Sequence, residues 1–149
     1  MKFNKAIRAI NNQLTEEWDR WCPLAAGNCG MFTVSLSRFL TKRNVPHRIL
    51  FLTVWDGEEE MTTLTPQKII DENMPGNHYV VEVGGKIVDF QGINSPDIID
   101  EYSNHWNLEK LTLYVLDGNL YDIERAAQHN TCHDVFSRDF DEVIEKHFV

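Results

Sequence analysis

Three residue types that serve nucleophilic catalysis stand where the fold can bring them together: a thiol, an imidazole and a carboxylate. Cys29 follows Gly27-Asn28 and opens a periodic apolar run, so it is expected in the first turn of a buried helix. The free N–H groups and positive dipole end of that turn favour a thiolate. A lone cysteine in an amphipathic helix is more often a packing residue, so a catalytic interpretation needs a base close by.

A predicted hairpin supplies the base. Gly84-Gly85 is a two-residue turn between two β-rich runs, which predicts paired strands with His78 opposite Gln91. Because side chains alternate between faces, His78, Asp89 and Gln91 then project from one face. His78 and Asp89 become diagonal neighbours, roughly 7–8 Å apart between Cα atoms, whereas a three-residue turn would separate them. The hairpin therefore predicts an imidazole oriented by a carboxylate, which is the base that a thiol nucleophile requires.

A second group of chemically capable residues lies near the C-terminus. His129, Cys132 and His133 fall within a few residues of one another and are ligand types that zinc prefers. A structural zinc site needs four ligands, usually as two separated pairs, and only Cys22 or His105 could add to the group from elsewhere. Solvated polar residues are the favoured interpretation, so no metal and no other cofactor is predicted.

The elements that must position these residues follow from hydrophobic periodicity and turn signals. Their order predicts an α+β fold, with N-terminal helices packed on a mostly antiparallel sheet and C-terminal helices covering the body. Expected helices span 3–21, 29–43 with a stop at Asn44, 66–73 with Thr65 as N-cap, 95–102, and one or two segments of 120–149. Expected strands span 47–55, which should be central, 77–83, 86–91 and 110–116, with a polar loop over 56–65.

Composition and charge limit the classes of function. The chain has 149 residues, 42% of them hydrophobic, and no internal repeat or flexible linker, which predicts a single domain over residues 1–149. A formal charge of −9 argues against nucleic acid and anionic membranes as main partners. No apolar run approaches a membrane span, and three cysteines are too few for a disulfide scaffold, so a cytoplasmic location is expected.

Three motifs in sequence order resemble a known family. The strings GNCGMF at 27–32, VPHR at 45–48 and NHYVVEVGGKIVDF at 77–90 are similar to the core of the transglutaminase-like branch of the papain-like superfamily. In that family a G-x-C-x-x-F helix start, a G-[IV]-P-x-R strand start and an H-x-W-V-E-V…D-P hairpin follow in this order. The resemblance implies a papain-like fold with Cys29 as nucleophile, His78 as general base and acid, and Asp89 as the residue that orients His78.

Acyl transfer also needs donors for the developing oxyanion. The backbone N–H of Cys29 is one expected donor. The glutamine that papain-type members place upstream of the nucleophile is replaced by Pro23. Trp21, Trp18 and Asn28 are the candidates for the second donor, since transglutaminase-like members can use an upstream indole, and the sequence leaves the choice among them open.

Two classes of function remain. The first is a cysteine-dependent acyl-transfer enzyme, whether peptidase, amidase, deamidase or transglutaminase-like, that forms a thioester with a peptide, protein, amide or thioester substrate. The second is a catalytically inactive relative with the same fold that serves as a protein-binding module. The second acyl acceptor and the oligomeric state are not predicted.

Overall fold

The computed structural model describes residues 2–21, 29–53, 63–74, 78–89, 92–94, 112–129 and 135–148. The helices are α1 (Lys2–Glu16), α2 (Trp18–Trp21), α3 (Cys29–Lys42), α4 (Pro66–Asp71), α6 (Leu120–His129) and α7 (Ser137–His147). The strands are β1 (Arg48–Thr53), β2 (Thr63–Leu64), β3 (His78–Val83), β4 (Lys86–Asp89), β5 (Gly92–Asn94) and β6 (Thr112–Leu116).

The described strands form one six-stranded sheet in the order β2-β6-β1-β3-β4-β5. β2 and β6 run parallel, and the other neighbours pair antiparallel. β1 holds an inner position and is buried at every residue after Arg48, as its near-continuous apolar sequence predicts. Helices beside a mixed, mostly antiparallel sheet confirm the α+β class.

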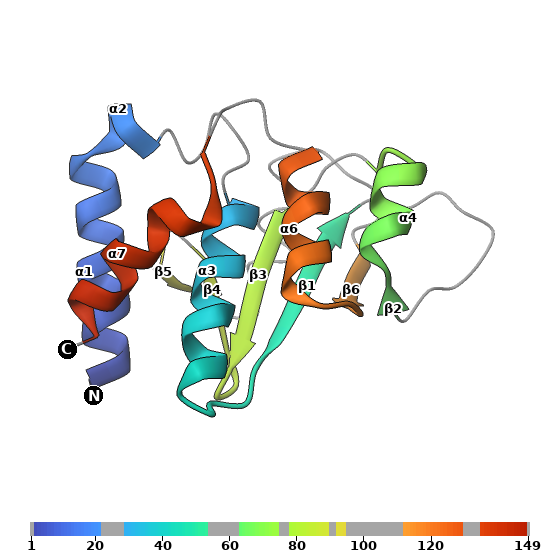
Figure 1. The fold of residues 1–149 in the computed structure, drawn as a ribbon. Coiled ribbons are helices and arrows are strands. Elements are labelled where there is room, and N and C mark those ends of the chain that lie inside the picture. Colours follow the sequence, from blue (N-terminus) through green and yellow to red (C-terminus); the bar gives the residue numbers. More distant parts are fainter. Residues whose placement is uncertain are drawn as a thin grey trace.

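The helices that the structure describes lie on one face of this sheet. Figure 1 shows α3 and α6 side by side over the strands, with α7 and α1 beyond α3, and residue contacts join α3 to both β3 and α6. Phe51 and Tyr79 point to this helix side and belong to the main core. Leu50 and Val80 point to the opposite side, where they form a second buried cluster. Alternation along β1 and β3 thus buries apolar side chains on both faces.

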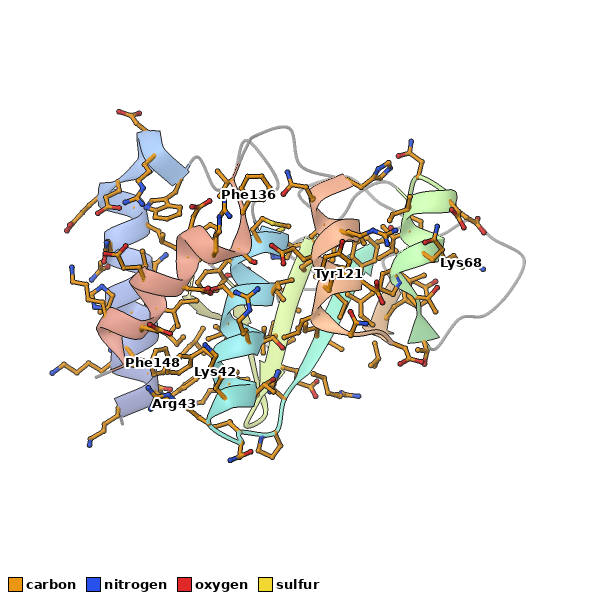
Figure 2. The ribbon with its side chains drawn as sticks, viewed as in Figure 1. Lys42, Arg43, Lys68, Tyr121, Phe136 and Phe148 are labelled. Carbon is orange, nitrogen blue, oxygen red and sulfur yellow. The ribbon has the colours of Figure 1, made fainter. Side chains whose placement is uncertain are left out.

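A left-handed residue ends α3 at the point where the chain turns toward β1. Asn44 adopts a left-handed φ of 56°, and the N–H of the next residue donates to the carbonyl of Leu40 at 3.0 Å. This is a Schellman arrangement, and it confirms Asn44 as the predicted helix stop. Figure 2 shows Lys42 and Arg43 at this end of the helix, near Phe148, the residue that follows α7. Cations in the last turn complement the negative end of the helix dipole.

The predicted first helix is wrong in one respect, because it is interrupted. α1 ends at Glu16, and α2 begins after Glu17. The carboxylate of Glu17 accepts hydrogen bonds from the Gln13 amide at 3.1 Å and from the Trp21 indole at 2.8 Å. Apolar spacing continues across the break, so hydrophobic periodicity alone does not reveal it.

Two short strands were not predicted. Thr63–Leu64 lies in the segment expected to be loop, yet it pairs with β6 and buries Leu64 completely. Gly92–Asn94 pairs with β4 at the sheet edge. Segments of two or three residues carry too little periodicity to predict. The neighbouring α4 does begin as predicted, with the Thr65 hydroxyl accepting from the Lys68 N–H at 3.3 Å and Pro66 as first residue, although it ends at Asp71.

Some expectations lie outside the described residues: the helix over 95–102, the ends of the strands at 54–55, 77, 90–91 and 110–111, and most of the loop over 56–65. The described part of the last predicted strand is confirmed as Thr112–Leu116.

Two amphipathic helices, α6 and α7, follow β6, as the C-terminal pattern predicts. Arg38 of α3 joins them through a polar cluster. Its guanidinium donates to both carboxylate oxygens of Asp141 at 2.9 Å and to the Ser137 hydroxyl at 3.0 Å, and lies 3.6 Å from Glu124. The cluster links α3, α6 and α7, and adds directional contacts to the apolar packing.

Candidate active site

The hairpin forms with the predicted register. Gly84 and Gly85 have φ of 56° and 73°, the left-handed values of a type I′ turn that glycine adopts without strain. β3 and β4 pair with Val83 opposite Lys86. A two-residue turn is therefore present, and the parity on which the site depends is confirmed. Gln91, expected on the same face, lies outside the described residues.

His78 and Asp89 meet as that register requires. His78 Nε2 lies 2.8 Å from Asp89 Oδ2, with the histidine 8% exposed and the aspartate 1% exposed. An ionised carboxylate only accepts, so the geometry assigns the proton of this bond to Nε2. Nδ1 is then the ring nitrogen left for a second partner. This is the geometry of a base whose tautomer and orientation are set by a carboxylate.

The second partner is Cys29. It is the first residue of α3 and 3% exposed, and its thiol is hydrogen-bonded to His78. The topology explains the meeting: α3 runs one way, β1 returns and β3 runs with α3 again, so α3 and β3 begin at the same end (Figure 1). His78 is the first residue of β3, where its ring can meet a helix on the other face of the sheet.

Charge at the site favours a protonated His78. Burial acts to lower its pKa. The charge of Cys29, hydrogen bonds with Asp89 and Cys29, and the charge of Asp89 outweigh that effect and raise the pKa from 6.5 to about 10. An imidazolium at neutral pH, placed between a sulfur and a carboxylate, is arranged to donate a proton to a leaving group.

Two residues next to this pair were missed by sequence reasoning. A Cβ built on Gly30 would lie 2.6 Å from Ala127 Cβ of α6 and 3.1 Å from the Tyr79 ring, so only glycine fits between them. Thr33 is fully buried, and its hydroxyl donates to the Tyr79 carbonyl at 3.1 Å. A glycine inside a helical pattern, and a threonine one turn beyond the cysteine, were the available signals.

Among the candidates for a second oxyanion donor, Trp21 is described by the structure, and its indole N–H already has an acceptor. The Trp21 indole N–H donates to Glu17 at 2.8 Å, and its ring stacks on Phe140 with centroids 4.6 Å apart. The Trp21 indole N–H therefore donates to the residue that lies between α1 and α2. Asn28 and the side chain of Trp18 lie outside what the structure describes. The backbone N–H of Cys29 lies in the first turn of α3, and its role as an oxyanion donor stays a prediction.

The zinc alternative falls mainly outside the described residues. His129 is exposed at the end of α6, and Cys132 and His133 are not described. Over the described part of the chain, His, Cys, Asp and Glu side chains form no group that could hold a metal ion. In the same part, no helix is long and apolar enough to cross a membrane.

A hollow of about 230 Å³ lies away from the candidate site. It is lined by α4, by the turn after β6 and by α6, with Pro66, Asp117 and Arg125 among its residues. None of the lining residues belongs to the group of Cys29, His78 and Asp89. The hollow therefore bears on packing between α4 and α6 and does not mark a substrate site for the thiol.

The motif resemblance covers residues 27–91, less than half of the chain, and rests on short strings around Cys29, His78 and Asp89. The geometry of these three residues is thus the main guide to function. Compared with protein-family models, curated proteins and solved structures, the chain gives no match.

Proposed function

We propose that this chain is a cysteine-dependent acyl-transfer enzyme in which Cys29 is the nucleophile, His78 the general base and acid, and Asp89 the residue that orients His78. The observation that carries the proposal is the position of His78, which is bonded to Asp89 at 2.8 Å and to the Cys29 thiol at the open end of α3. A thiol, a base and an orienting carboxylate in contact are what nucleophilic acyl transfer requires.

The reaction proceeds in two balanced halves. With its proton already held by His78, the Cys29 sulfur attacks a substrate carbonyl carbon to form a C–S bond, while the Cys29 N–H donates to the oxyanion. The tetrahedral adduct collapses as His78 protonates the leaving amine or thiol, which leaves a thioester on Cys29. Water or an amine, deprotonated by His78, then attacks the thioester. The C–S bond breaks, the acid or amide product departs, and the proton taken from water or the amine stays on His78, which restores the starting pair.

We further propose that the fold belongs to the transglutaminase-like branch of the papain-like superfamily. Supporting this are the cysteine at a helix start, the buried strand that follows and the hairpin bearing histidine and aspartate, in the order the family motifs have. The proposed substrates are peptides, proteins or small amides and thioesters. The charge of −9 supports the absence of nucleic acid and anionic membranes as main partners and fits a cytoplasmic location.

Burial of the thiol favours one competing function. Cys29 is 3% exposed and His78 8% exposed, as expected for residues that only pack. The competitor is a protein-binding module that keeps the fold and the three residues without turnover. It differs from the enzyme in one measurable respect, because a packing thiol that reagents cannot reach does not react at low pH.

Iodoacetamide labelling against pH separates the two. Labelled peptides are resolved by mass, so Cys29 is followed apart from Cys22 and Cys132. If the protein is an enzyme, iodoacetamide is expected to label Cys29 before the other cysteines at about pH 6, well below the ordinary thiol pKa of about 8.5. His78→Gln should lose this low-pH advantage, and Asp89→Asn should weaken it. A native protein in which Cys22 or Cys132 reacts while Cys29 stays unlabelled would contradict the enzyme proposal.

Intact-mass measurement then tests for the acyl-enzyme. The protein is incubated with separate pools of peptides and acyl thioesters, with and without an added amine. A mass gain equal to an acyl group, mapped to Cys29 and discharged faster when the amine is present, is expected. Cys29→Ser is the matched control, because a hydroxyl in the same place is far less nucleophilic and should give no adduct under these conditions.

A further inference from the structure

Thr33 is a buried polar residue in an otherwise apolar part of α3. Its side chain is fully buried, and its hydroxyl donates to the carbonyl oxygen of Tyr79 at 3.1 Å, across the interface between α3 and β3. The residues around it in the helix, including Phe32 and Val34, are core hydrophobics. A valine of nearly the same shape would fill this position without burying a polar atom, so shape alone does not account for a threonine here.

The two ends of this hydrogen bond lie next to the reacting pair. Thr33 follows Cys29 by four residues, which places both on the same side of α3 in successive turns. Tyr79 follows His78 directly in β3. The bond therefore ties the turn after the nucleophile to the peptide unit after the base, and few rotatable bonds separate it from either group.

Hydrophobic contact does not fix this register by itself. Apolar burial is non-directional, so α3 could slide along the sheet by a fraction of a turn and still cover Phe51 and Val81. A hydrogen bond at 3.1 Å is lost over a displacement of that size. Gly30 lets the helix approach the Tyr79 ring closely, and Thr33 then fixes its position along the strand.

We infer that Thr33 is a positioning residue, whose hydrogen bond to the Tyr79 carbonyl keeps the Cys29 thiol within hydrogen-bonding reach of His78. The inference rests on the proposed function and adds a residue to it that touches neither substrate nor reacting atoms. Its effect passes through Cys29, so it is measured as a change in thiol reactivity and in the pH dependence of that reactivity.

The test compares hydroxyl removal with hydroxyl retention. Thr33→Val keeps the branched shape and removes the donor, whereas Thr33→Ser keeps the donor. Thr41→Val is the matched control, since the Thr41 hydroxyl donates within α3 to the Ser37 carbonyl, away from the pair. The rate of Cys29 alkylation by iodoacetamide is measured from about pH 5 to about pH 9, with far-ultraviolet circular dichroism as a check on folding.

A misplacement of about 1 Å can cost about a hundredfold in rate. In the Thr33→Val variant, iodoacetamide should therefore alkylate Cys29 at least about tenfold more slowly than in the wild type at about pH 6. The pH of half-maximal rate should also move up, because a displaced His78 favours the thiolate less. Thr33→Ser and Thr41→Val should retain the wild-type profile. A purely structural role would lower thermal stability and leave this profile unchanged.

The outcomes distinguish the inference from the function on which it rests. Wild-type protein with low-pH reactivity and Thr33→Val with the same pH profile would overturn the positioning role alone. Wild-type protein in which Cys29 reacts only as an ordinary thiol would overturn both. If Thr33→Val does not fold, Thr33→Ala, which lacks the hydroxyl and crowds no neighbour, is measured in its place and judged by the same criteria.

Discussion

Gly30→Ala tests how closely α3 must approach its neighbours for Cys29 to meet His78. In most helices this substitution stabilises, by about 1 kcal/mol, because alanine loses less backbone entropy. Here the new methyl carbon would lie 2.6 Å from Ala127 Cβ and 3.1 Å from the Tyr79 ring. Ordinary carbon contacts fall at about 3.5–4.0 Å, so the first turn of α3 must move by about 1 Å.

The steric cost exceeds the helix-propensity gain. Overpacking a tight core costs about 1–3 kcal/mol, which leaves a net loss of about 1 kcal/mol in the free energy of unfolding. The effect on chemistry is larger, because Gly30 adjoins the proposed nucleophile and a displacement of about 1 Å can cost about a hundredfold in rate. Stability is measured by urea unfolding, and the geometry by the rate of Cys29 alkylation at about pH 6.

A second substitution supplies the control. Ala127→Gly removes the carbon nearest to the new methyl group, so Gly30→Ala with Ala127→Gly should recover part of the alkylation rate. Full recovery is not expected, since the contact with the Tyr79 ring persists. The reasoning is refuted if Gly30→Ala is at least as stable as wild type and labels Cys29 at the wild-type rate.

Three further predictions concern charge, turn chemistry and helix packing. Cys29→Ser removes a charge that raises the pKa of His78, while burial, which lowers that pKa, remains. The His78 pKa measured by imidazole NMR should therefore fall below about 10, and an unchanged value would show that the two side chains are not in contact. Asn44→Ala should lower the free energy of unfolding in urea by about 1 kcal/mol, because alanine is strained at a φ of 56°, whereas Asn44→Gly should leave it unchanged. An equal loss of stability in the two variants would argue against the left-handed cap. Arg38→Met leaves the carboxylates of Asp141 and Glu124 without a counter-charge, so the free energy of unfolding should fall by about 1–2 kcal/mol, and by a smaller amount in about 1 M salt. A loss of stability that salt does not change would mean that lost packing, not charge, is responsible.

The hairpin could be predicted from sequence because its determinants are local. Two consecutive glycines permit the positive φ values of a type I′ turn, and the turn length then sets the parity of the strands. His78 and Asp89 follow from that parity without knowledge of the rest of the fold. Asn44 as a helix stop and Thr65 as an N-cap were predictable for the same reason, since each depends on a few neighbouring residues.

What sequence reasoning missed depends on contacts between distant segments. Gly30 is required by Ala127 of α6, which lies far along the chain, and no local rule connects the two. The Trp21 indole was a candidate donor to an oxyanion, yet Glu17 accepts from it one helical turn away. β2 and β5 form because longer strands offer them an edge, and their own sequences hold little strand signal.

The proposed site joins both kinds of determinant. His78 and Asp89 belong to the side of the sheet that carries Leu50 and Val80, whereas Cys29 comes from a helix on the side that carries Tyr79. They can meet only at the end of β3, where no further residue of the strand separates the two faces. Any change that shifts α3 along β3 therefore separates the Cys29 thiol from His78, its proposed base, while leaving the hairpin intact. Loss of Cys29 reactivity with an unaltered bond between His78 and Asp89 is thus the signature expected when the helix, and not the hairpin, has moved.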